Sequence, residues 1–319
     1  MLGPPAPVPF DPGVLRTGSD LRRAGTEPSR EPGWHHVGHG AWLPDATWGR
    51  LTAVQRHAAV VHAADLRGSR RAQRTYALTS AAAVWGLPRI GPWPGTVTIL
   101  VADPAVRGTR VVRPHLGPPA ETVSLQGLRV TSAARTVVDL ARTGSLDSAL
   151  AAADHALRHG LCTPQQLAEE VAAVPRSSRG RRVAALVRDL ADPLSMSAGE
   201  SLSRLQMYRL NVPRPVLQGK REDSAGLIGY VDFDWENAVG EFDGKVKYRV
   251  PDGADPATAG EIVWREKKRE DRIRRQAPVG RWVWADALDA ERLRPILAAI
   301  GVRSAPRNTW FDLGAHHAG

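Results

Sequence analysis

Three acidic residues of the C-terminal half stand within or directly after two short apolar runs, Leu227–Phe233 and Ala238–Phe242. Strand side chains alternate between the two faces of a sheet, so acids two positions apart share a face. The residues between the runs are few enough for a hairpin turn. The pattern therefore predicts that Asp232, Glu241 and Asp243 converge at one end of a sheet.

Carboxylates at one point repel each other unless a proton or a cation relieves the repulsion. A small group of oxygen ligands suits Mg²⁺, which keeps several waters and takes one or two carboxylates together with substrate phosphates. Lys245 follows the acids closely and could hold a phosphate or assist a water. This favours metal-assisted phosphodiester hydrolysis with Mg²⁺, or Mn²⁺ in its place. The simpler alternative is a solvated hairpin with one polar face.

The order of these motifs resembles the PD-(D/E)xK nucleases, and most closely the very-short-patch-repair-like branch. Val231–Trp235 and Gly240–Lys245 carry the resemblance, with Glu200 of Ser197–Ser201 as the acid on a preceding helix. The resemblance implies a restriction-endonuclease-like core over 195–303, in the order α-β-β-β-α-β-α.

The resemblance also assigns roles to residues of the candidate site. It implies that Asp232 and Glu241 bind the metal, and that Asp243 is a third ligand or orients a water. Lys245 or Lys247 would stabilise the phosphate, and the choice between them stays open. Glu200 also completes a Ser-x-x-Glu capping box, which is an equally good reason for its presence.

Basic residues make up a large part of the chain, which carries a formal net charge of +10. A positive chain favours binding to nucleic acid, although an arginine-rich genome would give the same balance. Only five of the 43 basic residues are lysine, and all five lie after position 219. We predict that a strongly charged helix over 261–275 contacts the DNA backbone through Lys267, Lys268, Arg269 and Arg272, and the alternative is an ordinary solvated helix face.

A second resemblance covers the preceding part of the chain. Ser80–Leu87 and Gly127–Ala141 are similar to the AbiEi-type antitoxin and transcriptional-regulator family, in which a winged helix binds DNA. The first 50 residues do not have the pattern of such a winged helix. Arg135 and Asp139 are four positions apart on a predicted helix, so we interpret them as a structural ion pair.

These features divide the chain into four predicted parts. A poorly ordered lead covers 1–45, and a mixed and mostly helical regulator or interaction domain covers 46–192. The nuclease-like domain covers 195–303, and a tail covers 304–319. The expected fold class is α/β (α+β). The strands expected before the regulator helices are 96–101, 110–115 and 123–130.

Composition excludes several classes of protein and of site. A single cysteine, Cys162, rules out a disulfide framework and a cysteine-rich zinc site. We expect a cytoplasmic protein without a membrane association, since no apolar run is long enough for a span. The sequence contains no glycine-rich phosphate loop, so we expect no nucleotide cofactor. His35, His36 and His39 are better explained by a pair of strands than by a metal site.

The sequence therefore predicts a Mg²⁺-dependent DNA endonuclease with an N-terminal specificity or interaction module. The alternative is a DNA-binding regulator or antitoxin-like protein whose nuclease-like domain is inactive. DNA is the expected partner in both cases. The sequence is compatible with a homodimer or with an activating protein partner, but no motif in it indicates either.

Overall fold

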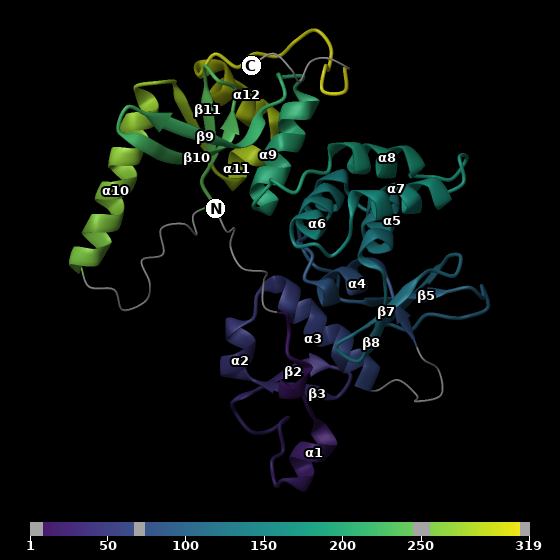
Figure 1. Ribbon diagram of the computed structural model, residues 1–319. Coiled ribbons are helices and arrows are strands. Elements are labelled where there is room, and N and C mark those ends of the chain that lie inside the picture. The colour runs from purple at the N-terminus through teal and green to yellow at the C-terminus, as the bar shows by residue number, and fades with distance from the viewer. Residues whose placement is uncertain (1–8, 67–73, 245–255, 313–319) are drawn as a thin grey trace. The chain divides into compact units, whose positions relative to one another are not determined.

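The fold is mixed α and β, as the sequence predicted, and divides into two compact units (Figure 1). The computed structural model describes residues 9–66, 74–244 and 256–312, and the side chains of all of these except 256–263. The first unit ends at Pro193 and the second begins at Leu194.

The first unit opens with a small antiparallel sheet in the order β1-β3-β2, which lies against two helices. Its elements are η1 (Pro12–Val14), β1 (Arg16–Thr17), α1 (Gly18–Arg23), β2 (Trp34–Gly38), β3 (Ala41–Pro44), α2 (Asp45–Arg50) and α3 (Ala53–Leu66). Phe10 and Leu43 are buried in a common core with α3 residues. The predicted poorly ordered lead over 1–45 is therefore wrong for residues 9–45, because their scattered apolar side chains share one core. The pair of strands expected around His35, His36 and His39 is present as β2 and β3.

A five-stranded sheet follows, in the order β6-β5-β4-β8-β7. Its elements are β4 (Thr75–Tyr76), α4 (Leu78–Trp85), β5 (Val97–Val101), β6 (Val112–Leu116), β7 (Thr122–Leu125) and β8 (Leu128–Thr131). The single strand predicted over 123–130 is two strands of a hairpin. Gln126 and Gly127 both have positive φ, which is the backbone of a tight type I′ turn. A glutamine at such a position gives no sequence signal for a turn.

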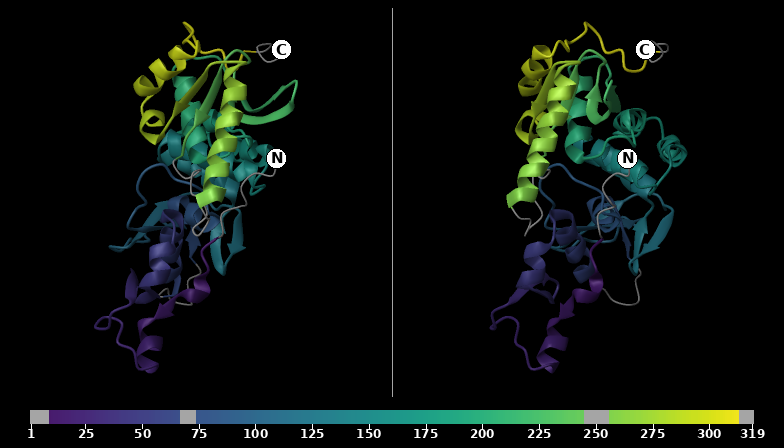
Figure 2. Two further views of the ribbon diagram at one scale, coloured as in Figure 1. Left: turned by 90° about the vertical axis from the view of Figure 1, so that its left-hand side faces the viewer. Right: turned by 60° about the vertical axis from the view of Figure 1, so that its left-hand side comes forward.

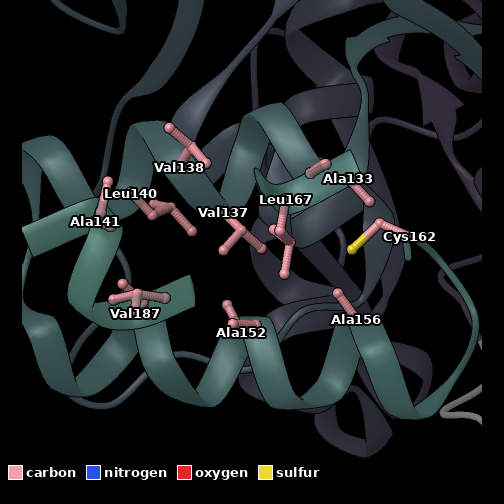
Figure 3. Packing of buried hydrophobic residues seen from close by; sticks show 14 of the residues in the cluster. Ala133, Val137, Val138, Leu140, Ala141, Ala152, Ala156, Cys162, Leu167 and Val187 are labelled. Carbon is pink, nitrogen blue, oxygen red and sulfur yellow. The ribbon is translucent and has the colours of Figure 1, made fainter. Parts of the chain in front are cut away.

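Four helices complete the first unit and enclose its largest apolar core (Figure 3). They are α5 (Ala133–Thr143), α6 (Leu146–Arg158), α7 (Pro164–Ala173) and α8 (Arg181–Leu190). The side chains of Ser132, Ser145 and Thr163 cap the first three of them. Val137, Leu167 and small alanines from facing helices fill the core, so the helix backbones lie close together.

The second unit has the predicted order of elements, with one additional short helix, α11. Its elements are α9 (Ala198–Arg209), β9 (Val216–Asp223), β10 (Gly226–Asp234), β11 (Val239–Phe242), α10 (Pro256–Arg274), β12 (Val279–Trp282), α11 (Trp284–Ala287) and α12 (Ala290–Ala299). The sheet order is β12-β11-β10-β9, with β11 and β12 parallel and the other pairs antiparallel. Trp310, in the predicted tail, is buried against this unit.

Helices cover both faces of this sheet (Figure 2). Ile273 of α10 packs with Val239 and Val279 on one face. On the other face, a Cβ at Gly199 of α9 would overlap the Phe242 ring. Glycine at position 199 therefore allows α9 to lie directly on β11, where the acidic motif of the sequence is located.

Truncation of Leu167 to alanine tests the packing of the first unit. Leu167 is 2% exposed, and we expect Leu167→Ala to lower the free energy of opening of α5–α8 by about 2–5 kcal/mol. Native-state hydrogen exchange of the full chain measures this separately for each unit. Leu116→Ala is the control, since Leu116 is 58% exposed. Equal effects of the two substitutions would contradict the packing described.

The first unit should also lose stability in mild acid. Burial, together with the charge of Arg89, lowers the pKa of His57 to about 4. The unfolded chain takes up a proton near pH 6.5, so stability is present above that pH and is lost as the pH falls toward 4. Differential scanning calorimetry across this range should show a weaker pH dependence for His57→Gln. The second unit is an internal reference, because residues 194–312 contain no histidine.

Candidate active site

The centre of the candidate site is the point where β10 and β11 stop pairing through their backbones. The ladder includes Phe233 with Gly240 and Asp234 with Val239. Two residues beyond Gly240, the Phe242 N–H donates to Oδ2 of Asp232 at 2.9 Å. Asp232 is itself only 8% exposed. The acceptor for this buried N–H is therefore a buried side-chain carboxylate in place of a backbone carbonyl.

Glu200 approaches the same place from the first turn of α9. Its Oε2 accepts from the Met196 N–H at 2.9 Å, and its Oε1 accepts from the Ser197 hydroxyl at 2.9 Å. Ser197 Oγ in turn accepts from the Glu200 N–H, as expected for a helix cap. Glu200 is only 3% exposed. Ser197 therefore caps α9 as predicted, but Glu200 accepts from the N–H of Met196 rather than of Ser197, so the reciprocal capping box is not formed. These hydrogen bonds fix the Glu200 carboxylate inside the unit.

Gln218 of β9 joins the two acids. Its Nε2 lies 3.4 Å from Oε2 of Glu200 and 3.5 Å from Oδ1 of Asp232. The two carboxylates therefore lie on either side of one amide, although they are 32 positions apart in the sequence. Gln218 has a φ of 52°, which is uncommon for a residue other than glycine. The sequence gives no signal for Gln218, because it lies within a predicted strand.

Glu241 has a different environment from Asp232 and Glu200. Its Oε1 accepts from Arg269 at 2.8 Å and its Oε2 lies 3.0 Å from Arg281. Arg281 also pairs with Glu266 and Glu270 of α10. Glu241 is therefore part of an ion-pair network that joins β11, β12 and α10. The sequence predicted Glu241 as a metal ligand and gave no signal for these two arginine partners.

The remaining predicted acids and lysines are distributed differently. Asp243 directly follows Phe242 and is half-buried, and its N–H donates to the Trp282 carbonyl. Lys245 and Lys247 lie outside the described residues. Among the described residues, no group of three or more His, Cys, Asp or Glu is placed to hold a metal ion. The acids that the structure brings together are Glu200 and Asp232.

The predicted DNA-contacting helix is α10, and two of its four predicted basic residues are used inside the unit. Arg269 pairs with Glu241 and donates to the Tyr230 carbonyl, and Arg272 forms two hydrogen bonds with Asp223. The hydrogen bond from Arg272 lowers the pKa of Asp223 to about 2. These two arginines fasten α10 to the sheet.

The other two predicted DNA-contacting residues, Lys267 and Lys268, are exposed on α10. Nζ of Lys268 lies 3.3 Å from the ring centroid of Trp264, a cation–π contact. Trp264 is itself 58% exposed, which is unusual for so large an apolar side chain. An exposed aromatic ring beside two lysines has the composition of a surface that binds nucleic acid.

Comparison with known proteins gives partial relatives without a stated activity. No family model matches the chain. Over 167 residues, 50% of this chain, the sequence is 34% identical to "Uncharacterized protein Rv2248" of Mycobacterium tuberculosis (strain H37Rv) and equally to "Uncharacterized protein MT2308" of strain CDC 1551 / Oshkosh. The match spans 57% of each relative's length. None of the described helices is long and apolar enough to cross a membrane.

Replacement of Arg269 tests the structural assignment of the ion-pair network. Arg269→Gln leaves Glu241, 14% exposed, with one arginine partner, so the free energy of opening of β11 and α10 should fall by about 1–3 kcal/mol. Hydrogen exchange of the second unit measures this loss. Arg274→Gln on the same helix removes an exposed pair with Glu270 and should cost less than about 1 kcal/mol. A smaller effect at Arg269 than at Arg274 would contradict the assignment.

Proposed function

We propose that the second unit is a metal-dependent DNA endonuclease with a restriction-endonuclease-like core. The observation that supports this most strongly is the convergence of Glu200 and Asp232 on Gln218, beside the end of the β10–β11 ladder. Two buried carboxylates from separate elements are costly to place together unless the site uses them. The N-terminal unit would then be a specificity or interaction module.

The donor set suits a hard divalent cation, Mg²⁺ or Mn²⁺. Mg²⁺ takes one or two protein carboxylates and completes its shell with water and substrate phosphates. Glu200 and Asp232 would hold it, and Asp243, next to the residue that Asp232 binds, would add a ligand or orient a water. When bound, the ion would polarise the phosphodiester and lower the pKa of a coordinated water. In this proposal Glu241 is not a ligand, because its oxygens face Arg269 and Arg281.

The protein's own groups would orient the acids before substrate arrives. The Phe242 N–H fixes one oxygen of Asp232, and the Met196 N–H together with the Ser197 hydroxyl fixes both oxygens of Glu200. Gln218 holds the two side chains at one separation. Such preorganisation reduces the reorganisation needed during the reaction. Lys245 or Lys247 would stabilise the phosphate, and Lys267 and Lys268 would contact the DNA backbone.

The alternative function is a DNA-binding regulator or antitoxin-like protein with an inactive nuclease-like domain. One observation favours it: the predicted group Asp232, Glu241 and Asp243 is not assembled as a metal site within the described residues. In that case the network around Glu241 would be purely structural. Both functions place the protein in the cytoplasm with DNA as its partner, and a homodimer or an activating protein partner is compatible with both.

A plasmid nicking assay with Mg²⁺ or Mn²⁺ separates the two functions. We expect cleavage by the wild type and a loss of at least about a hundredfold in Asp232→Asn and Glu200→Gln, since several kcal/mol of transition-state stabilisation are removed. Glu222→Gln is the matched control, because Glu222 is an exposed acid of the same sheet, paired with Lys220. It should cleave like the wild type.

Other results of the nicking assay would contradict the proposed site or favour the regulator. Cleavage that persists in Asp232→Asn and Glu200→Gln would place the chemistry elsewhere. No cleavage by any variant, with salt-dependent DNA binding retained, would favour the regulator. Circular dichroism of each variant excludes unfolding as the cause of a loss.

A further inference from the structure

A pocket of about 410 Å³ lies in the first unit, separate from the site of the second unit. This volume is at the small end of the range for ligand sites. The N-terminus of α5 forms one side of the pocket, and α7 with the end of the preceding loop forms the other. Trp85, Val123 and Leu161 contribute apolar surface. Some of the polar groups of the pocket lack hydrogen-bond partners within the described residues, and these groups determine which ligand the pocket suits.

Arg135 is the most informative of these groups. It is 8% exposed, and its Nε donates to Oδ2 of Asp139 at 2.7 Å, as the spacing in the sequence predicted. Its Nη2 is buried and has no hydrogen-bond partner within the described part of the chain. A buried guanidinium N–H without an acceptor is costly, so an acceptor group at this position would be strongly favoured.

The first turn of α5 adds further donors. Ser132 Oγ accepts from the Arg135 N–H, which leaves the N–H groups of Ala133 and Ala134 without an intrahelical acceptor. Ala133 and Ala134 both line the pocket. Together with Arg135 they form a positive end of the pocket, with the geometry that binds a carboxylate or a phosphate at a helix N-terminus.

Acidic side chains line the same pocket, so a simple anion does not suit it. Glu121, Glu169 and Glu170 all face it. Glu170 is half-buried, forms no hydrogen bond or ion pair within the described residues, and has a pKa raised by burial. Its carboxylate therefore has no donor among the described residues, just as Nη2 of Arg135 has no acceptor there. The charge of Arg135 acts on Glu170, but no hydrogen bond or ion pair joins the two within the described residues. A ligand with both kinds of group would satisfy both.

We propose that this pocket binds a free α-amino acid with an apolar side chain. Its carboxylate would accept from Arg135 Nη2 and from the N–H groups of Ala133 and Ala134, and its ammonium would donate to Glu170. The side chain would lie against Trp85 and Leu161. A zwitterion matches a pocket that carries separated charges of both signs, whereas a phosphate or a plain carboxylate would meet repulsion from the three acids.

Isothermal titration of the full chain with L-leucine, L-methionine and L-phenylalanine tests the proposal. We expect at least one of them to bind. The N-acetyl derivative, which lacks the ammonium, and the methyl ester, which lacks the carboxylate, should each bind at least about tenfold more weakly, the loss expected for one charged hydrogen bond. These comparisons use the wild-type protein, so a failure of a variant to fold does not affect them.

Two further measurements locate the site. Glu170→Gln should weaken binding about tenfold, whereas Asp189→Asn, an exposed acid of α8 outside the pocket, should have no effect. Cys162 lines the pocket and is the sole cysteine of the chain. An amino acid at ten times its dissociation constant should slow alkylation of Cys162 by iodoacetamide about tenfold.

Several results would overturn the proposal. These are no binding of any of the three amino acids, equal binding of the N-acetyl or ester derivative, tighter binding of inorganic phosphate than of any amino acid, and binding that leaves Cys162 alkylation unchanged.

Discussion

The hydrogen bond from the Phe242 N–H to the Asp232 carboxylate governs the arrangement of the second unit. A buried backbone N–H must have an acceptor, and here the β10–β11 ladder ends two residues before Phe242, so no carbonyl of β10 is paired with its N–H. The Asp232 carboxylate accepts this hydrogen bond in place of a carbonyl. Gln218 then turns toward Asp232 with a left-handed backbone, and Glu200 completes the group from the neighbouring helix. One unpaired position in a ladder thus organises three elements.

The acids of the second unit accept hydrogen bonds from different kinds of group. Glu241 lies between two arginines, so its charge is largely compensated and contributes to the attachment of α10. Asp232 and Glu200 accept hydrogen bonds from backbone N–H groups, a hydroxyl and an amide, which orient the two carboxylates. Acids that one motif pattern groups together, such as Asp232 and Glu241, can therefore have different tasks. In the first unit, Asp139 pairs with Arg135, whereas Glu170 forms no ion pair within the described residues.

Much of the fold could be predicted from the sequence, because apolar periodicity and helix caps are local signals. They placed α5, α7, α9 and the order of elements in the second unit correctly. The Gln126–Gly127 turn and the ordered residues 9–33 were missed, since a glutamine with positive φ and a core assembled from scattered residues leave no periodic pattern. For the candidate site, alternation along a strand identified Asp232. It could not identify Gln218 or the arginine partners of Glu241, because these contacts depend on where separate elements meet.

The parallel pairing of β11 with β12 has a consequence for how the second unit folds. Phe242 pairs with Trp282, which is far along the chain, and α10 lies between the two strands. The β9–β10–β11 meander needs only short loops, whereas the parallel pair requires closure of a long one, which costs more entropy and is slower. We therefore expect a folding sequence in which Asp232 meets Phe242 before β12 docks. The candidate site would then be formed while the sheet still has an open edge.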